Sequence, residues 1–418
     1  MNYKKLLGAA SAVLMIVVVI TLALTSGAWG QTKYKTLHTF HGKDGTGPEA
    51  GLIFDAAGNL YGTTNGGGAY KEGTVFELTP TSNGGWAETV LYSFCAQSKC
   101  TDGKNPFASV IFDAAGNLYG TASGGQNGKY CYDGCGVVFE LTPTTSGEWT
   151  ESVLYSFTGG PDGAGPVAGL VVDTAGNLFG TTWQGGHITS FCYDGCGVVF
   201  ELTPGSKGWT ESVPHTFMDK WDGSNSTAAL VLDSTGNLYG VAWNGGRYED
   251  GNVFKLTPNS DGSWTEKVLH QFRGKDGAEP QGRLIFDTAG NLYGSTIVSE
   301  AYGSVFQLVP NSNGTWTRHI LHQFKGGKDG ATPYAGLTFD SAGSLYGDTN
   351  SGGDHGYGVV FRLTPTSTGG WSYRVLHAFN STSGANPRGD LVVDGAGNLY
   401  GTTYAGGKGH GTVFEITP

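Results

Sequence analysis

The sequence predicts an all-β fold, a seven-bladed β-propeller in which four antiparallel strands build each blade. Three observations predict it: a motif returns along the whole chain, each copy lies in a unit of four short predicted strands, and the last unit lacks its fourth strand. Repetition at a nearly constant period is typical of rings and stacks of like units. The first copy reads Asp55-Ala-Ala-Gly-Asn-Leu-Tyr-Gly62, and the seven copies begin at Asp55, Asp113, Asp173, Asp233, Asp287, Asp340 and Asp394.

The unit around residues 50–94 shows how the strands are expected to follow one another. Its first strand is a short apolar run, and its second strand follows a turn that Asp55 opens and Gly58 closes, because glycine adopts positive φ at little cost. A glycine-rich loop leads to a third, alternating strand, and a second turn leads to the fourth. A parallel β-helix is the alternative repeat fold, but its coils are shorter and lack such hairpin turns. The four strands are expected at residues 50–54, 60–64, 74–78 and 88–94.

Two further details favour a closed ring. Pro214 stands in a fourth strand where the other units carry leucine, and proline in a sheet is confined to edges and bulges, so the fourth strand should be the outer edge. The chain ends at Pro418 within the third strand of the last unit, while residues 35–40 match the fourth strand at 267–272. The N-terminal strand is therefore expected to complete the last blade.

The N-terminus predicts export. Lys4 and Lys5 precede an apolar run from Leu6 to Leu24, and small residues end at Gly30, which indicates a signal peptide over residues 1–30 and a mature propeller over 31–418. An uncleaved signal anchor is the alternative, because the run is long enough to span a bilayer. We expect a secreted, periplasmic or envelope-associated monomer. The formal net charge of −11 makes nucleic acids and anionic lipids poor partners.

The six cysteines fall in three local pairs. In an exported chain such pairs indicate short-loop disulfides. Zinc is the alternative, but zinc sites favour Cys-x2-Cys with a second pair nearby, and these spacings are longer. About fifteen pairings are possible for six cysteines, so local pairing is a preference only. The expected pairs are Cys95–Cys100, Cys131–Cys135 and Cys192–Cys196.

One face of the predicted ring carries the variation. The loops after the second and fourth strands share this face, which we call the loop face, and all three cysteine-bearing insertions fall on it in neighbouring units. Binding sites are commonly built by such loops on a rigid scaffold, and aromatic rims suit sugar rings or flat ligands. The alternative for Trp183 and Trp243 is packing between blades or in the channel mouth. The candidate ligand-binding residues are Trp183, Trp243, Tyr132, Tyr193, Asp133, Asp194, His187 and Tyr404.

No metal, cofactor or catalytic set stands out in the sequence. Asp-Gly pairs between the units could together bind Ca²⁺, but each is separately explained as a turn former. Asp133 and Asp194 are the carboxylates that an acid–base pair would use. A histidine series in the fourth strands shares its position with Tyr92 and Tyr155, which indicates an aromatic body with a polar tip and not a metal ligand. The Asp-Gly series is Asp44, Asp102, Asp162, Asp222, Asp276 and Asp329, and the histidines are His38, His215, His270, His322 and His377.

The repeat also resembles a known family. Its pattern Gly-Leu-x-x-Asp-x-x-Gly-Asn-Leu-Tyr-Gly-Thr-Thr, followed by Gly-x-Val-Phe-x-Leu-Thr-Pro, is similar to the GloVer (choice-of-anchor) tandem repeat of bacterial exported proteins, from Lys35 to Pro418. The resemblance implies export and a propeller-like array, and it supplies no catalytic residues. The Asp-x-x-Gly-Asn-Leu-Tyr core also resembles NHL-type propeller repeats, a likeness of fold.

Three functions are compatible with these observations. The sequence favours a secreted binding module that recognises a glycan or an extracellular protein through the loop face, because the cysteine-braced insertions cluster there. A structural envelope protein is the second, since the repeats are nearly uniform. An enzyme acting on polysaccharide or a lactone is the third, and it requires carboxylates or metal ligands that converge at the channel mouth.

Overall fold

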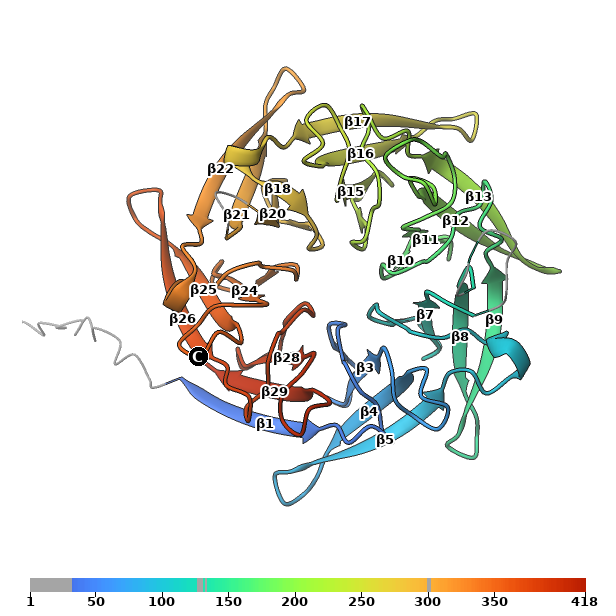
Figure 1. Cartoon of the computed structure of the whole chain (residues 1–418), viewed down its shortest axis with the longest axis vertical. Helices are drawn as coiled ribbons and strands as arrows, with labels where there is room; N and C mark the ends of the chain where they lie inside the picture. The colour runs from blue at the N-terminus through green and yellow to red at the C-terminus, as the bar shows by residue number, and fades with distance from the viewer. Residues whose placement is uncertain (1–31, 126–130, 132–133, 299–301) are drawn as a thin grey trace, which may run out of the picture. The chain divides into compact units, whose positions relative to one another are not determined.

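Seven antiparallel sheets stand in a ring, as the sequence predicts (Figure 1). The computed structural model describes residues 32–418 except 126–130, 132–133 and 299–301. The predicted signal peptide, Tyr132 and Asp133 therefore lie outside the described residues. No helix within the described ranges is long and apolar enough to cross a membrane.

Each sheet is one blade, and its strands follow the chain from the inside of the ring to the outside (Figure 1). In order of blades 1 to 7, the first strands are β2 (Ile53–Phe54), β6 (Ile111–Phe112), β10 (Val171–Val172), β14 (Val231–Leu232), β19 (Ile285–Phe286), β23 (Thr338–Phe339) and β27 (Val392–Val393). The second strands are β3 (Leu60–Thr64), β7 (Leu118–Ala122), β11 (Leu178–Thr181), β15 (Leu238–Ala242), β20 (Leu292–Val298), β24 (Leu345–Thr349) and β28 (Leu399–Thr403).

The outer two strands of each blade are longer than the innermost one. The third strands are β4 (Thr74–Pro80), β8 (Val137–Pro143), β12 (Val198–Gly205), β16 (Asn252–Pro258), β21 (Ser304–Pro310), β25 (Val359–Pro365) and β29 (Thr412–Thr417). The fourth strands are β5 (Trp86–Ser93), β9 (Trp149–Ser156), β13 (Gly208–Thr216), β17 (Trp264–Gln271), β22 (Trp316–Gln323), β26 (Trp371–Ala378) and, in blade 7, β1 (Lys33–Thr39). Blade 5 also contains β18 (Ala278–Pro280), and the 3-10 turns η1 (Ser98–Cys100), η2 (Gly274–Asp276) and η3 (Gly327–Asp329) lie between blades.

The N-terminal strand closes the ring. β1 pairs with β29 in antiparallel register, with Thr36 opposite Phe414, so the first described strand is the outer edge of the last blade (Figure 1). The predicted closure is confirmed. Blade 7 would otherwise end at β29, and the unpaired backbone groups of β29 would form an exposed edge.

The repeated motif forms a hydrogen-bonded turn between the first and second strands. In blade 1, Asp55 Oδ1 accepts from the backbone N–H groups of Ala57 and Asn59, at 2.8 Å each. Its other oxygen accepts from Asn59 Nδ2 and from the Tyr61 hydroxyl. One carboxylate thus satisfies four donors and fixes the angle at which the second strand leaves the turn.

The motif ends in glycine because a phenylalanine of the third strand lies directly over that position. A Cβ built on Gly120 would meet Cζ of Phe139 at 2.5 Å, and Gly62 meets Phe76 in the same way at 2.7 Å. A methyl group there would force the aromatic ring out of its place. The glycine is therefore a packing requirement of every blade.

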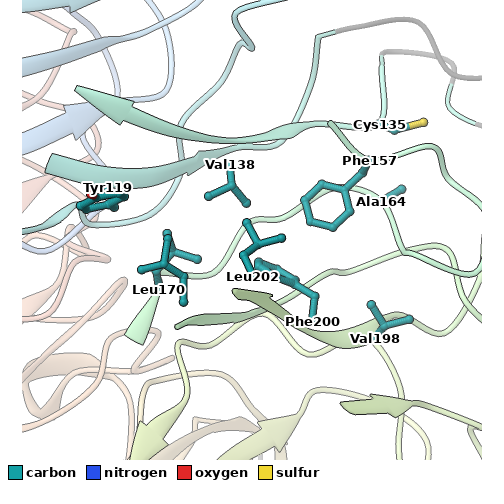
Figure 2. Packing of buried hydrophobic residues seen from close by; sticks show 10 residues of the cluster. Tyr119, Cys135, Val138, Phe157, Ala164, Leu170, Val198, Phe200 and Leu202 are labelled. Atoms are coloured by element: carbon teal, nitrogen blue, oxygen red, sulfur yellow. The ribbon is translucent and has the colours of Figure 1, made fainter. Parts of the chain in front are cut away.

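Neighbouring blades share a hydrophobic core. A phenylalanine that follows each fourth strand meets the third-strand phenylalanine of the next blade edge to face, as Phe157 meets Phe200 with ring centroids 5.1 Å apart. Figure 2 shows this contact at the seam between blades 2 and 3, with Val138, Leu170 and Leu202 packed beside it. The same pair recurs at all seven seams. Each seam therefore has its own hydrophobic cluster, and the cluster between blades 7 and 1 forms only when the ring closes.

Pro214 lies where the sequence places it, in an outer strand. β13 is the last strand of its sheet, and its pairing with β12 shifts between Ser212 and His215. Proline therefore occupies a bulge on an edge strand, where its missing N–H leaves no ladder bond unmade.

Candidate functional site

The loop face is a connected layer. In six blades the loop before the first strand pairs with the loop after the second, as Lys104 pairs with Gly124 and Ala164 with Gln184. The three predicted disulfides, which brace this layer, are present: Cys95–Cys100, Cys131–Cys135 and Cys192–Cys196.

A pocket lies where the innermost strands of the seven blades meet. Its volume is about 860 Å³, within the range of small-molecule sites. Three of the predicted ligand-binding residues line it together: Trp183, Trp243 and Asp194. The disulfide residue Cys131 is also part of its wall, so one of the braced loops borders the pocket.

The pocket wall divides into two arcs of different chemistry. Blades 2 to 4 contribute a largely apolar arc that includes Phe107, Val167, Trp183 and Trp243, although Gln184 and Asp194 also belong to it. Blades 5, 6, 7 and 1 contribute a polar arc, made of Gln281, Arg283, Tyr334, Arg388, Asp390 and Glu49. A ligand in the pocket would therefore meet an aromatic surface on one side and hydrogen-bonding groups on the other.

Within the polar arc, an ion pair joins two blades that are not neighbours in the ring. Arg283 Nε of blade 5 donates to Asp390 Oδ2 of blade 7 at 3.1 Å, and the backbone N–H of Gly336, in the blade between them, donates to Asp390 Oδ1 at 2.6 Å. The arginine is 40% exposed, so part of its guanidinium group faces the pocket. The two hydrogen bonds fix the orientation of the Asp390 carboxylate.

A second ion pair borders the first. Arg388 Nη1 donates to Glu49 Oε1 at 3.1 Å, which joins blade 7 to blade 1. The Arg388 guanidinium lies over the Tyr404 ring at 4.5 Å from its centroid and over the Tyr334 ring at 5.5 Å. Burial raises the pKa of Glu49, although Arg388 opposes the rise. Tyr404, a predicted ligand-binding residue, thus supports Arg388 instead of lining the pocket.

The two tryptophans are held differently. Trp183 is 38% exposed, and its backbone carbonyl accepts from Asn225 Nδ2 at 2.8 Å, which fixes its loop to the next blade. Trp243 is half-buried, and its indole N–H donates to Glu279 at 3.2 Å. Trp183 therefore offers the accessible aromatic face, and Trp243 forms part of the wall.

Other predicted ligand-binding residues lie outside the pocket. Tyr193 is 78% exposed and His187 is exposed, on the loop that the Cys192–Cys196 disulfide closes. They extend the loop face around the pocket but do not line it. Because Asp133 is outside the described residues, its predicted pairing with Asp194 stays a prediction.

The sequence interpretation missed the polar arc, although a signal for it was present. The residue four positions before each repeated aspartate lies at the inner edge of its blade, and it is small in five blades: Gly51, Ser109, Gly169, Ala229 and Gly336. Blades 5 and 7 carry Arg283 and Asp390 instead. Alignment of the seven units at this position identifies the two charged residues as exceptions.

The Asp-Gly residues between the blades act as turn formers. Asp102 accepts from the backbone N–H of Ala96 and from the Tyr92 hydroxyl, both at 2.8 Å. Asp222 accepts from the backbone N–H of Met218 and contacts His215 Nε2 at 3.1 Å. Tyrosine at one seam and histidine at the other therefore contact the equivalent aspartate, as the shared sequence position predicts.

One buried carboxyl group lies behind the polar arc. Asp348 is 1% exposed, and both its carboxyl oxygens are without a hydrogen-bond partner among the described residues. Burial raises the pKa of Asp348 well above its ordinary value, and the nearby Asp390 adds to the rise. In five other blades the equivalent side chain is Thr or Ser, whose hydroxyl donates to a carbonyl oxygen of the next blade: Thr63, Thr121, Thr181, Ser295 and Thr402.

We expect Asp348→Thr to raise the free energy of unfolding by about 1–3 kcal/mol, because it replaces an unsatisfied buried group with one that bonds across the seam. Chemical denaturation at pH 7 measures the change. Thr121→Val is the matched control, since it removes the same bond in blade 2 and should destabilise the protein. A loss of stability in Asp348→Thr would contradict the assignment of Asp348 as an unsatisfied group.

Comparison with known proteins supports the repeat. A family model described as the Gloeobacter/Verrucomicrobia repeat matches residues 23–193, 87–301 and 297–418. No curated protein is similar enough to this chain to give a match. Among solved structures, a Thermus thermophilus protein described as an oxidoreductase (glucose dehydrogenase) is 15% identical, with a TM-score of 0.41 over 92% of this chain and 100% of that one. At this level the likeness carries no argument about fold or function.

Proposed function

The chain belongs to the Gloeobacter/Verrucomicrobia repeat family, and from the pocket of its propeller we infer that it is an exported binding module that recognises a glycan. The observation that carries this proposal is the division of the pocket into an aromatic and a polar arc. A sugar ring has an apolar face of C–H groups and an edge of hydroxyl groups, so it suits both arcs at once.

The charges of the pocket disfavour an anionic ligand. Both arginines of the polar arc are already paired with carboxylates, Arg283 with Asp390 and Arg388 with Glu49. Among the described residues, the pocket therefore has no unpaired arginine for a phosphate or sulfate group. Its paired groups still have hydrogen-bonding capacity for hydroxyls, because an arginine has five N–H donors.

The proposal also explains the cysteine-braced loops. The loop closed by Cys192–Cys196 carries Asp194 into the pocket wall and places Tyr193 on the surface beside it. A short disulfide limits the conformations of such a loop before the ligand arrives, which reduces the entropy cost of binding.

We expect the mature protein to retain neutral oligosaccharides on a glycan array, and Trp183→Ala to weaken binding of the best ligand about tenfold in calorimetry. Tenfold corresponds to about 1.4 kcal/mol, the size of one good stacking contact. Trp221→Ala is the matched control, because Trp221 is 71% exposed outside the pocket. No retention of any glycan, or an equal loss in both variants, would overturn the proposal.

A further inference from the structure

The seam between blades 7 and 1 gathers one histidine and two carboxylates. His38 lies on β1, Asp44 in the loop that follows it, and Glu88 on β5 of the next blade. His38 Nε2 is 3.0 Å from Asp44 Oδ2, and one ligand atom from each of the three residues lies within 4.8 Å of the others. Among the described residues, no other three His, Cys, Asp or Glu side chains are gathered so closely.

The carboxylate of Glu88 is poorly satisfied in this seam. Its Oε1 is buried and has no hydrogen-bond partner within the described part of the chain. The carboxylate of Asp44 lies beside it, in the same cluster. A cation between the two carboxylates would relieve both the missing partner and the repulsion.

A second histidine stands at the open side of the cluster. His41 Nδ1 is 3.5 Å from the same oxygen of Asp44, and the His41 backbone N–H donates to Asp44 Oδ1 at 2.7 Å, which fixes the loop. His41 Nε2 contacts Lys408 Nζ at 3.1 Å, and this exposed lysine would move away when a cation binds.

The other seams lack the full set of two histidines and two carboxylates, although a buried Oε1 without a partner recurs in Glu151, Glu211 and Glu266. The next two seams keep the glutamate, as Glu151 and Glu211, but have tyrosine at the position of His38. At the seam of blades 5 and 6, Tyr373 stands at the position of Glu88 and stacks on His322 at 3.8 Å. The seam of blades 3 and 4 repeats the residue types as His215, Asp222 and Glu266, but Met218 replaces the second histidine.

We propose that this seam is a Zn²⁺ site, formed by His38, Asp44 and Glu88 with His41 as the fourth ligand. Two imidazole nitrogens and two carboxylates match the four-coordinate preference of zinc, whereas Ca²⁺ takes six to eight oxygen ligands. His38, His41 and Asp44 belong to the closing strand and its loop, and Glu88 belongs to blade 1. The ion therefore fastens the last blade to the first, beside the Phe40–Phe76 contact.

Calorimetric titration of the untagged mature protein with ZnCl₂ tests the site. We expect one tight ion per chain and a melting temperature that rises with zinc and returns after EDTA, because a metal that binds only the folded state stabilises it. Glu88→Gln and His41→Gln should each weaken this binding at least about tenfold. Glu151→Gln, the same change at the next seam, is the matched control and should leave zinc binding unchanged.

Three results would overturn the proposal: no tight zinc ion, zinc binding that survives Glu88→Gln, or equal effects of Glu88→Gln and Glu151→Gln. The binding measurement does not depend on the variants having identical stability, because circular dichroism at 20 °C establishes that each is folded before titration. Glycan binding is measured separately, so the failure of one proposal does not affect the other.

Discussion

Replacing Phe40 with alanine is expected to lower the free energy of unfolding by about 3–5 kcal/mol, the usual cost of removing a fully buried phenylalanine. Phe40 is completely buried, and its ring lies 5.1 Å from that of Phe76, edge to face. This contact joins the loop after β1 to blade 1. Urea denaturation followed by tryptophan fluorescence measures the loss, and Phe191→Ala, which changes a ring that is 63% exposed, should have little effect.

Because Phe40 follows the strand that closes the ring, its replacement should also loosen that strand, which the replacement of other core phenylalanines should not do. Phe157 makes the same contact with Phe200 at the seam of blades 2 and 3, so Phe157→Ala is a matched control for the cavity. Only Phe40→Ala should speed amide hydrogen exchange in β1, because β1 pairs with β29 alone and is the outer edge of its sheet. Equal exchange of Lys33–Thr39 in the two variants would show that Phe40 has no special part in closure.

The free energy of unfolding is expected to decrease as the pH rises from about 4.5 to 7, because of two glutamates in neighbouring seams. Burial, with Asp102 adding to it, raises the pKa of Glu151 to about 7, and burial with Asp162 does the same for Glu211. Each folded-state pKa lies above the ordinary value of 4.5. Their stabilising contribution is therefore complete below pH 4.5 and is lost as the pH rises through 7.

The double variant Glu151→Gln with Glu211→Gln should remove this part of the pH dependence. After allowance for solvent screening of partly exposed groups, we expect it to be more stable than the parent by about 2 kcal/mol at pH 8 and nearly equal at pH 4. Melting curves from pH 4 to 8 measure this, with Glu148→Gln, at an exposed turn, as control. Parallel curves for parent and double variant would contradict the expected ionisation.

The fold could be predicted from the sequence because each blade is specified locally. Asp55 and its repeats bond within their own turn, and Gly120 sits under Phe139 of its own blade. The order of the seven units along the sequence gives the order of the blades. The strand order and the closing role of β1 can therefore be inferred without knowledge of long-range contacts. The family pattern itself consists of these turn and packing residues.

The site was only partly predictable because its residues come from different blades. Trp183, Trp243 and Asp194 share a loop face that the repeat defines, so the sequence could place them together. Arg283 and Asp390 meet across an intervening blade, and nothing in either local sequence indicates the partner. Glu88 meets His38 only because the ring closes, so the pattern of the histidine series could not by itself place these two residues together.

The pairing of β1 with β29 also has a consequence for the order of folding during synthesis. The ribosome releases β1 before any other described strand, and β29, its only neighbour in the sheet, is the last of the described strands to be made. Until then β1 is unpaired and the blades already made form an incomplete ring. The exposed strand edges of both can pair with other polypeptide chains and cause aggregation. Closure of the ring must therefore await synthesis of β29, and a chaperone that covers β1 until then would reduce mispairing.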